Sequence, residues 1–128
     1  MRAVVFLRGA WLMNLYHCQI DIKQDAKALA FSHALGVWMN HLKSNGSITE
    51  WRLMRRKLNL ASDGHRDFLL EIEVEDLTQL DSAFRLSGSQ DEDIAQMHRA
   101  VHDLIQSADF GLYRSFPDPE RSERMALI

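Results

Sequence analysis

The chain has 128 residues, of which 46% are hydrophobic and 26% are charged, and its formal net charge is −3. These values predict one domain with one buried core. They also argue against a protein that grips nucleic acid through its phosphates, because such binding needs clustered Lys and Arg in excess. The single cysteine, Cys18, excludes an intramolecular disulfide framework and favours a reducing cytoplasm.

The first twelve residues, MRAVVFLRGAWL, are apolar and carry two arginines. The apolar run between Arg2 and Arg8 is too short for the core of a signal peptide or for a membrane span. We interpret residues 1–12 as an extension that is disordered or outside the native protein, with translation starting at Met13. An extra edge strand or partner-binding segment and a targeting segment are the alternatives. The domain is then predicted to cover residues 13–117, and the charged residues 118–128 to form a C-terminal tail.

Residues 14–22 alternate between two faces and predict a half-buried strand. One face carries Tyr16, Cys18, Ile20 and Ile22, and the other carries His17, Gln19 and Asp21.

From residue 25 to about residue 43 the apolar period becomes helical, with one arc about 100° wide. That arc consists of Ala28, Phe31, Leu35, Trp38, Met39 and Leu42. A second, shallower stripe consists of Ala26, Ala30, Ala34 and Val37. The helix is therefore expected to contact two surfaces, for example its own sheet and a second subunit. Gly46 is the predicted stop after this helix.

A β-hairpin is predicted over residues 48–74, with a basic first arm, ITEWRLMRRKLNL, and a turn at ASDGH. In the second arm the core face carries Phe68, Leu70, Ile72 and Val74, while the other face carries Asp67, Leu69, Glu71 and Glu73. The first arm changes phase between Leu53 and Leu58. We therefore predict a β-bulge near residues 54–56 that brings Trp51, Leu53, Leu58 and Leu60 to the core face.

Two helices and a strand complete the predicted domain. Asp76 is the expected N-cap of a short helix that ends at Ser87-Gly88-Ser89. Ser89 and Glu92 form a capping-box pattern for a second helix, which reaches about residue 107. The last strand is predicted over residues 109–116, ended by Pro117 and Pro119.

The predicted order is strand, helix, strand, strand, helix in two pieces, strand. Two split βαβ units in this order give an α+β, ferredoxin-like fold, a four-stranded antiparallel sheet with the helices on one face. The other face stays uncovered. Leu69 and Tyr113 on this face favour its burial against a second copy of the chain.

The element order, the interrupted second helix and Phe110-Gly111-Leu112-Tyr113 of the last strand resemble the dimeric α/β-barrel superfamily. In that superfamily two ferredoxin-like subunits close their sheets into a barrel. The segments NLYHCQIDI, WRLMRRKLNL and RDFLLEIEVEDLTQLDSAF are similar to an uncharacterised bacterial domain family within it. The resemblance covers residues 14–116 and implies a homodimer. The superfamily includes cofactor-free monooxygenases, haem-degrading enzymes, isomerases and stress-responsive proteins, so the resemblance implies no single reaction.

His17 is the first candidate site residue, because it lies mid-strand on the uncovered face with Gln19 beside it. An imidazole there can act as a general acid or base, or can bind a ligand. The alternative is a hydrogen-bonded histidine at a dimer interface. Tyr113 of the last strand is a candidate for orienting a substrate or ligand.

The basic arm of the hairpin carries four candidate cations, Arg52, Arg55, Arg56 and Lys57. Arginine suits bidentate binding of a carboxylate or phosphate. An even-sum hairpin register instead places Arg55 and Lys57 opposite Glu71 and Glu73 as ordinary charge pairs. The arginine left without a carboxylate opposite it, Arg52 or Arg56 depending on the bulge, is the better ligand candidate.

Other reactive side chains carry weaker signals. His98 and His102 have a spacing that can bind metal, but no third ligand accompanies them, and we predict no metal site. Cys18 alternates onto the core face and is expected to be a buried, inert thiol. Trp38 and Trp51 are expected in the core or an interface, with stacking on a flat aromatic substrate as the alternative.

Two functions follow from these candidates. The first is a homodimer that binds a small organic ligand, for which an anion is a candidate, in the cleft between sheets. The second is a cofactor-independent enzyme of monooxygenase or isomerase type, with His17 as the acid or base and an arginine or Tyr113 orienting the substrate. The sequence shows no nucleophile with its base and no phosphate-binding loop, which ranks binding above catalysis. We expect no cofactor, no nucleic-acid or membrane partner, and a cytoplasmic location.

Overall fold

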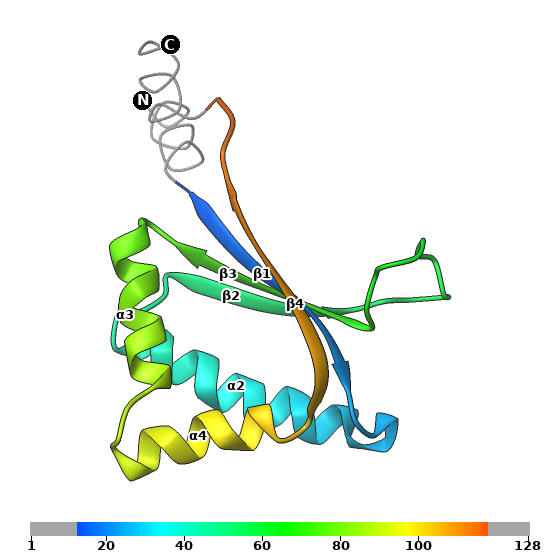
Figure 1. Ribbon diagram of the computed structural model, residues 1–128, viewed down its shortest axis with the longest axis horizontal. Coiled ribbons are helices and arrows are strands. Elements are labelled where there is room, and N and C mark those ends of the chain that lie inside the picture. Colours follow the sequence, from blue (N-terminus) through cyan, green and yellow to red (C-terminus); the bar gives the residue numbers. More distant parts are fainter. Residues whose placement is uncertain (1–12, 118–128) are drawn as a thin grey trace.

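The structure is a computed structural model that describes residues 13–117. The strands are β1 (Asn14–Ile22), β2 (Glu50–Arg55), β3 (Phe68–Val74) and β4 (Ile105–Arg114). The helical segments are η1 (Asp25–Lys27), α2 (Ala28–Ser44), α3 (Leu77–Ser87) and α4 (Glu92–His102). The strands form one antiparallel sheet in the order β2-β3-β1-β4. All helices lie on one side of the sheet, so the predicted ferredoxin-like architecture is confirmed (Figure 1).

The core lies between the sheet and the helices, and the predicted strand faces supply it. β1 is a central strand that pairs with β3 on one side and β4 on the other, and it buries Cys18 and Ile20. β3 buries all four of its predicted core residues, Phe68, Leu70, Ile72 and Val74. The opposite face of both strands is uncovered, and this places His17 and Gln19 outside the core.

Helix α2 covers the sheet with the predicted arc. Phe31, Leu35, Trp38, Met39 and Leu42 are buried, and the Phe31 ring packs against Phe68 at 5.1 Å between centroids. The helix is followed by Gly46 with φ of 82°, a left-handed conformation that favours glycine. The second stripe of α2 lies beside α4 in the same subunit, with Ala34 and Val37 sharing a groove with residues of α4. Helix α4 therefore accounts for Ala34 and Val37, whereas Ala26 and Ala30 of that stripe are exposed.

The predicted bulge in the first hairpin arm is wrong. β2 pairs with β3 without interruption from Glu50 opposite Glu73 to Arg55 opposite Phe68, and the strand ends there. Leu58 and Leu60 are 86% and 78% exposed in the loop that follows, not in the core. Leu58 has φ of 57°, and this left-handed backbone breaks the extended run whose alternation the prediction continued.

The predicted even-sum register, with Arg55 and Lys57 opposite Glu71 and Glu73, is also wrong, because every residue pair of β2 and β3 has an odd sum. In the observed register Arg52 lies opposite Glu71, and Arg55 lies opposite Phe68. Lys57 lies outside the strand.

The second half of the domain differs from the prediction at its boundaries. Asp76 caps α3 as predicted, with its side chain accepting a hydrogen bond from the Gln79 amide at 2.8 Å. The N-cap of α4 is Asp91 instead of Ser89, because the Asp91 carboxylate accepts from two amides of the first turn. α4 ends at His102, and β4 starts at Ile105, four residues before the predicted strand. The apolar residues at 104–108 that continue the helical stripe therefore belong mostly to β4.

Within residues 13–117 no helix combines the length and apolar character that crossing a membrane requires. The predicted extension at residues 1–12 and the predicted tail at residues 118–128 lie outside the described residues.

Candidate functional site

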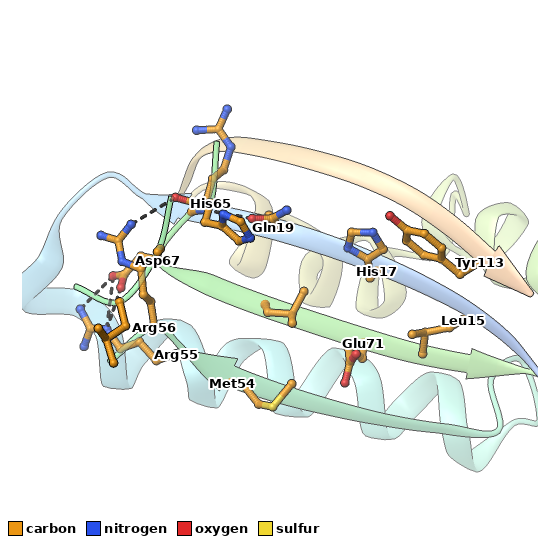
Figure 2. Close-up of a pocket in the computed structure, with 14 residues that line it drawn as sticks. Leu15, His17, Gln19, Met54, Arg55, Arg56, His65, Asp67, Glu71 and Tyr113 are labelled. Atoms are coloured by element: carbon orange, nitrogen blue, oxygen red, sulfur yellow. Dashed lines mark hydrogen bonds and ion pairs between the residues drawn. The ribbon is translucent and has the colours of Figure 1, made fainter. Parts of the chain in front are cut away.

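A concave region of about 400 Å³ lies on the uncovered face of the sheet. It takes side chains from all four strands and from the loop between β2 and β3 (Figure 2). Four of the five predicted ligand residues line it: His17, Gln19, Arg56 and Tyr113. The apolar side chains of Leu15 and Leu69 lie between and beside them. The region therefore combines an apolar floor with a few polar groups, as small-molecule sites do.

His17 and Tyr113 form the aromatic end of this region. Their ring centroids are 4.9 Å apart and their planes differ by 26°. The His17 Nδ1 atom is buried and has no hydrogen-bond partner within the described residues. The imidazole is thus held by packing and not by a hydrogen-bonded partner, which leaves it without the carboxylate that commonly orients a catalytic histidine.

Arg66, which sequence reasoning missed, ties the other end of the region together. Its guanidinium donates to Asp21 at 2.9 Å, to Asp109 at 2.8 Å and to the Ser107 hydroxyl at 2.8 Å. Its backbone amide donates to Gln19 Oε1 at 3.0 Å. Arg66 therefore links the start of β3 to the adjoining ends of β1 and β4.

These contacts also shift the pKa values of Asp21 and Arg66. The Asp67 backbone amide donates to Asp21, and this hydrogen bond, followed by that of Arg66, holds the pKa of the Asp21 carboxyl below its ordinary value. The pKa of Arg66 is raised, mainly by its hydrogen bond to Asp109. Both side chains are therefore charged at neutral pH, and the Arg66 charge is already neutralised by its two carboxylates.

The other arginines near the region differ in whether a carboxylate is within reach. Arg52 forms an ion pair with Glu71 across β2 and β3, and it does not line the region. Arg55 pairs with Asp25 and with Asp67. These pairs are partly exposed, so their main consequence is that they neutralise the carboxylates beside the region.

Arg56 differs from Arg52, Arg55 and Arg66, which are each paired with a carboxylate. Its Nη1 donates to the backbone oxygen of His65 at 3.1 Å. Within residues 13–117 it has no carboxylate oxygen within 4.0 Å. Of the two arginines that the sequence offered as ligand candidates, Arg56 is therefore the one with hydrogen-bond donors not used by a carboxylate.

A second hollow, of about 210 Å³, lies on the helix side of the sheet, between the strands and the helices. Its lining is mostly apolar and includes Tyr16, Cys18, Trp38, Phe84, His98 and Phe110. The Tyr16 ring contacts Phe84 at 5.5 Å and Phe110 at 5.9 Å between centroids. We call it the helix-side hollow.

The reactive groups at the helix-side hollow are weakly acidic or weakly basic because they are buried. Burial raises the pKa of the Cys18 thiol to about 12. Burial, and then the neighbouring His102, lowers the pKa of His98. The two imidazoles lie 5.9 Å apart, and within the described residues no three His, Cys, Asp or Glu side chains gather as a metal site would require.

A family model matches residues 13–128, and its description is "Family of unknown function (DUF6614)". The chain belongs to this family. No curated protein matched the DUF6614 chain.

Solved structures resemble the DUF6614 chain in fold. A conserved protein from Methanosarcina mazei Go1 superimposes with a TM-score of 0.65 at 11% identity, covering 85% of this chain and 98% of that one. A dimeric ferredoxin-like protein of unknown function from Jannaschia sp. CCS1 gives 0.61 at 8% identity, covering 80% and 99%. SnoaB, a cofactor-independent oxygenase from Streptomyces nogalater, gives 0.59 at 10% identity, covering 84% and 99%. At these identities the likeness establishes the ferredoxin-like fold alone.

For the DUF6614 chain, the uncovered strand face could be read from alternation, and this placed His17, Gln19 and Tyr113 correctly. The contacts of Arg66 carried no local signal, because its carboxylate partners lie on β1 and β4, far away in sequence. Met54 and His65, which also line the region, were missed because the first arm was assigned a bulge and the loop was treated only as a turn.

Proposed function

We propose that this chain is a cytoplasmic homodimer that binds a small organic, anionic ligand in the concave region of the uncovered sheet face. The observation that carries the proposal is the meeting of His17, Gln19, Arg56 and Tyr113 in that one region. A second copy of the chain closes the region from above. The cytoplasmic location is supported by the free, buried thiol of the chain's one cysteine.

Self-association is supported by the character of the uncovered face. Tyr113 on edge strand β4 is 61% exposed, Met54 on the opposite edge strand β2 is 40% exposed, and Leu15 and Leu69 between them are half-buried. Apolar side chains on an open sheet face are commonly buried against another sheet. The Jannaschia protein of the same fold is described as dimeric.

The preference for an anion rests on the charges around the region. Glu71 and Asp67 line it, but Arg52 and Arg55 neutralise them. Arg56 adds a positive charge that acts on Asp21 from a distance but forms no ion pair within 4.0 Å among the described residues. A carboxylate at Arg56 gains charge-assisted hydrogen bonds, while the apolar body of the ligand lies along Leu69 and Leu15 toward Tyr113.

A thermal-shift screen tests the anion preference. The probes are aliphatic and aromatic carboxylates, each beside its neutral amide, including 2-naphthoate and 2-naphthamide. A carboxylate at a hundred times its Kd stabilises the protein by about 2.7 kcal/mol through mass action, which shifts Tm by several degrees. We expect the carboxylate shift to fall in Arg56→Gln and to persist in Lys57→Gln, the matched control, because Lys57 does not line the region. Equal shifts for acid and amide would contradict the proposal.

A further variant distinguishes binding in the concave region from binding in the helix-side hollow. Ala108 lines only the helix-side hollow, so Ala108→Leu fills that space and leaves the concave region intact. We expect ligand shifts to survive in Ala108→Leu and to decrease in His17→Ala. The opposite pattern would place the ligand between the sheet and the helices and would refute the assignment.

Light scattering at micromolar concentration tests the dimer. We expect twice the monomer mass of 14.8 kDa. Tyr113→Lys should shift the protein toward monomer because it buries a charge in the proposed interface. Val37→Lys, at an exposed position on the opposite side of the sheet, is the control and should leave the dimer intact. A wild-type monomer would rule out closure by a second copy.

A cofactor-independent enzyme is the second candidate, favoured by the presence of His17 beside Tyr113 and an arginine in one region. In that function His17 is the acid or base, and the arginine orients the substrate. SnoaB of the same fold is described as a cofactor-independent oxygenase. Oxygen consumption with phenols and quinols, measured without added cofactor, tests it. Activity that disappears in His17→Ala supports the enzyme, and turnover that is unchanged in that variant argues against His17.

A further inference from the structure

Gly111 lies in the middle of β4, directly opposite His17 of β1. Glycine in a strand interior is unfavourable, because it has no side chain to pack and loses more backbone freedom on folding than other residues. The backbone does not require it here, since the positive-φ glycines within residues 13–117 are Gly46 and Gly64. The space above the Gly111 Cα atom, and not its backbone conformation, is where a side chain would meet an obstacle.

The His17 imidazole fills that space. A Cβ atom at position 111 would lie 2.6 Å from His17 Nε2 and 3.2 Å from His17 Cδ2, and 3.4 Å from Tyr113 Cε2. The first distance is shorter than side chains tolerate, so any other residue at position 111 forces the imidazole to move. The missing side chain lets the ring lie across β4 beside Tyr113.

The result is an aromatic surface on the uncovered face. Figure 2 looks onto that face with the helices behind the sheet, and the His17 and Tyr113 rings lie next to each other on it, in a stacked arrangement. Both rings line the concave region. We call this pair the His17–Tyr113 platform. Aromatic faces of this kind favour offset stacking with a planar ring, a preference beyond simple burial of apolar area.

We infer that Gly111 is a positioning residue that holds His17 flat beside Tyr113, and that the resulting platform selects a planar, aromatic acid as the ligand. The inference rests on the proposed function and specifies its ligand class. The aromatic body stacks on the platform, and an acid group on a linker that crosses β1 and β3 reaches Arg56 at the other end of the region. Of the two His17 nitrogens, Nδ1 is buried, so Nε2 is the one directed toward β4 and the ligand.

The first test measures the position of the imidazole without any ligand. The His17 ring resonances are identified in ¹H–¹³C spectra as those lost in His17→Ala. In the wild type the ring current of Tyr113 displaces these resonances from the ordinary histidine range. We expect Tyr113→Leu and Gly111→Ala each to remove that displacement. Unchanged His17 resonances in Gly111→Ala would overturn the positioning role, whether or not a ligand is found.

The second test measures ligand selection in the full chain. The probes are 2-naphthoate and its saturated counterpart, decahydro-2-naphthoate, which has the same acid group without a planar ring. When His17 is present, we expect Gly111→Ala to weaken 2-naphthoate binding roughly fivefold. When His17 is replaced by alanine, the same substitution should weaken binding less than about twofold. The difference arises because the effects of two substitutions depend on each other only when the residues are in contact. The saturated acid should bind the wild type more weakly than 2-naphthoate.

The outcomes separate this inference from the proposed function. Equal losses from Gly111→Ala in both backgrounds, with carboxylate binding retained, would overturn the inference and leave the anion site standing. Equal affinity for the planar and the saturated acid would overturn the ligand class. If neither acid nor any other carboxylate binds the wild type, the proposed function fails, and with it the ligand class.

Discussion

Cys18 offers a sharp test of the core, because it is the one cysteine in the chain and is only 4% exposed. The perturbation is a thiol reagent such as Ellman's reagent, added at pH 8 to native and to urea-unfolded protein. A pKa of about 12, against the ordinary 9.0, lowers the thiolate population about a thousandfold. A more basic thiolate is also more nucleophilic, which restores roughly twentyfold.

The burial that raises this pKa also restricts access, because the reagent cannot reach the sulfur without an opening of the sheet–helix core. For a domain stable by about 5 kcal/mol the globally open state has a population near 10⁻⁴. We therefore expect native Cys18 to react at least about 100-fold more slowly than in the unfolded chain. Native labelling within about tenfold of the unfolded rate would refute the buried, inert thiol and the packing around it.

The labelling rate of Cys18 also tests whether a ligand binds in the helix-side hollow, because Cys18 lines that hollow. A ligand in the concave region changes the labelling rate only through global stability. A ligand in the helix-side hollow covers the thiol directly. Protection by 2-naphthoate that persists in both Arg56→Gln and His17→Ala would indicate the second location.

Three further predictions concern stability. Phe31→Ala should lower the free energy of unfolding by about 3–5 kcal/mol, because Phe31 is 0% exposed and its removal leaves a cavity against Phe68; urea titration followed by circular dichroism measures it. Asp76→Ala should cost about 1 kcal/mol in the same titration, through loss of the α3 N-cap. Because the pKa of folded Asp21 is lowered, its contribution is present above the ordinary pKa near 3.8 and is lost as pH falls below it; Asp21→Asn should flatten that part of the stability-against-pH curve.

Matched controls accompany these predictions. Leu29→Ala, at an exposed position of the same helix as Phe31, should change stability by less than about 0.5 kcal/mol. Asp81→Ala removes an exposed charge inside α3 without affecting the cap, so a loss equal to that of Asp76→Ala would contradict the capping explanation. A stability curve of Asp21→Asn that keeps the wild-type slope below the ordinary pKa of 3.8 would show that the folded carboxyl is not stabilised by its hydrogen bonds.

Much of the fold could be predicted because alternation and helical periodicity are local signals. The alternation of β1 and β3 identified their buried faces correctly, and the helical arc identified the buried face of α2. The bulge in β2 was wrong because hydrophobic leucines in a turn imitate a strand. Leu58 and Leu60 are apolar, yet the left-handed backbone at Leu58 takes both out of the sheet. Hydrophobic periodicity in a sequence does not show where the backbone becomes left-handed.

The sequence by itself determined the fold class, the uncovered face of the sheet and the placement of His17, Gln19 and Tyr113 on it. These follow from which residues are apolar at which spacing, and that information is local. Only the tertiary structure decided which cations have partners, because strand register and strand order set those distances. Register pairs Arg52 with Glu71, and the order β3-β1-β4 brings Arg66 to its two carboxylates, whereas Arg56 has no ion pair among residues 13–117.

The pairing of β1 with β4 likewise places Gly111 beneath His17. No periodicity links these two positions, which lie near opposite ends of the domain, so their contact depends on the folded sheet.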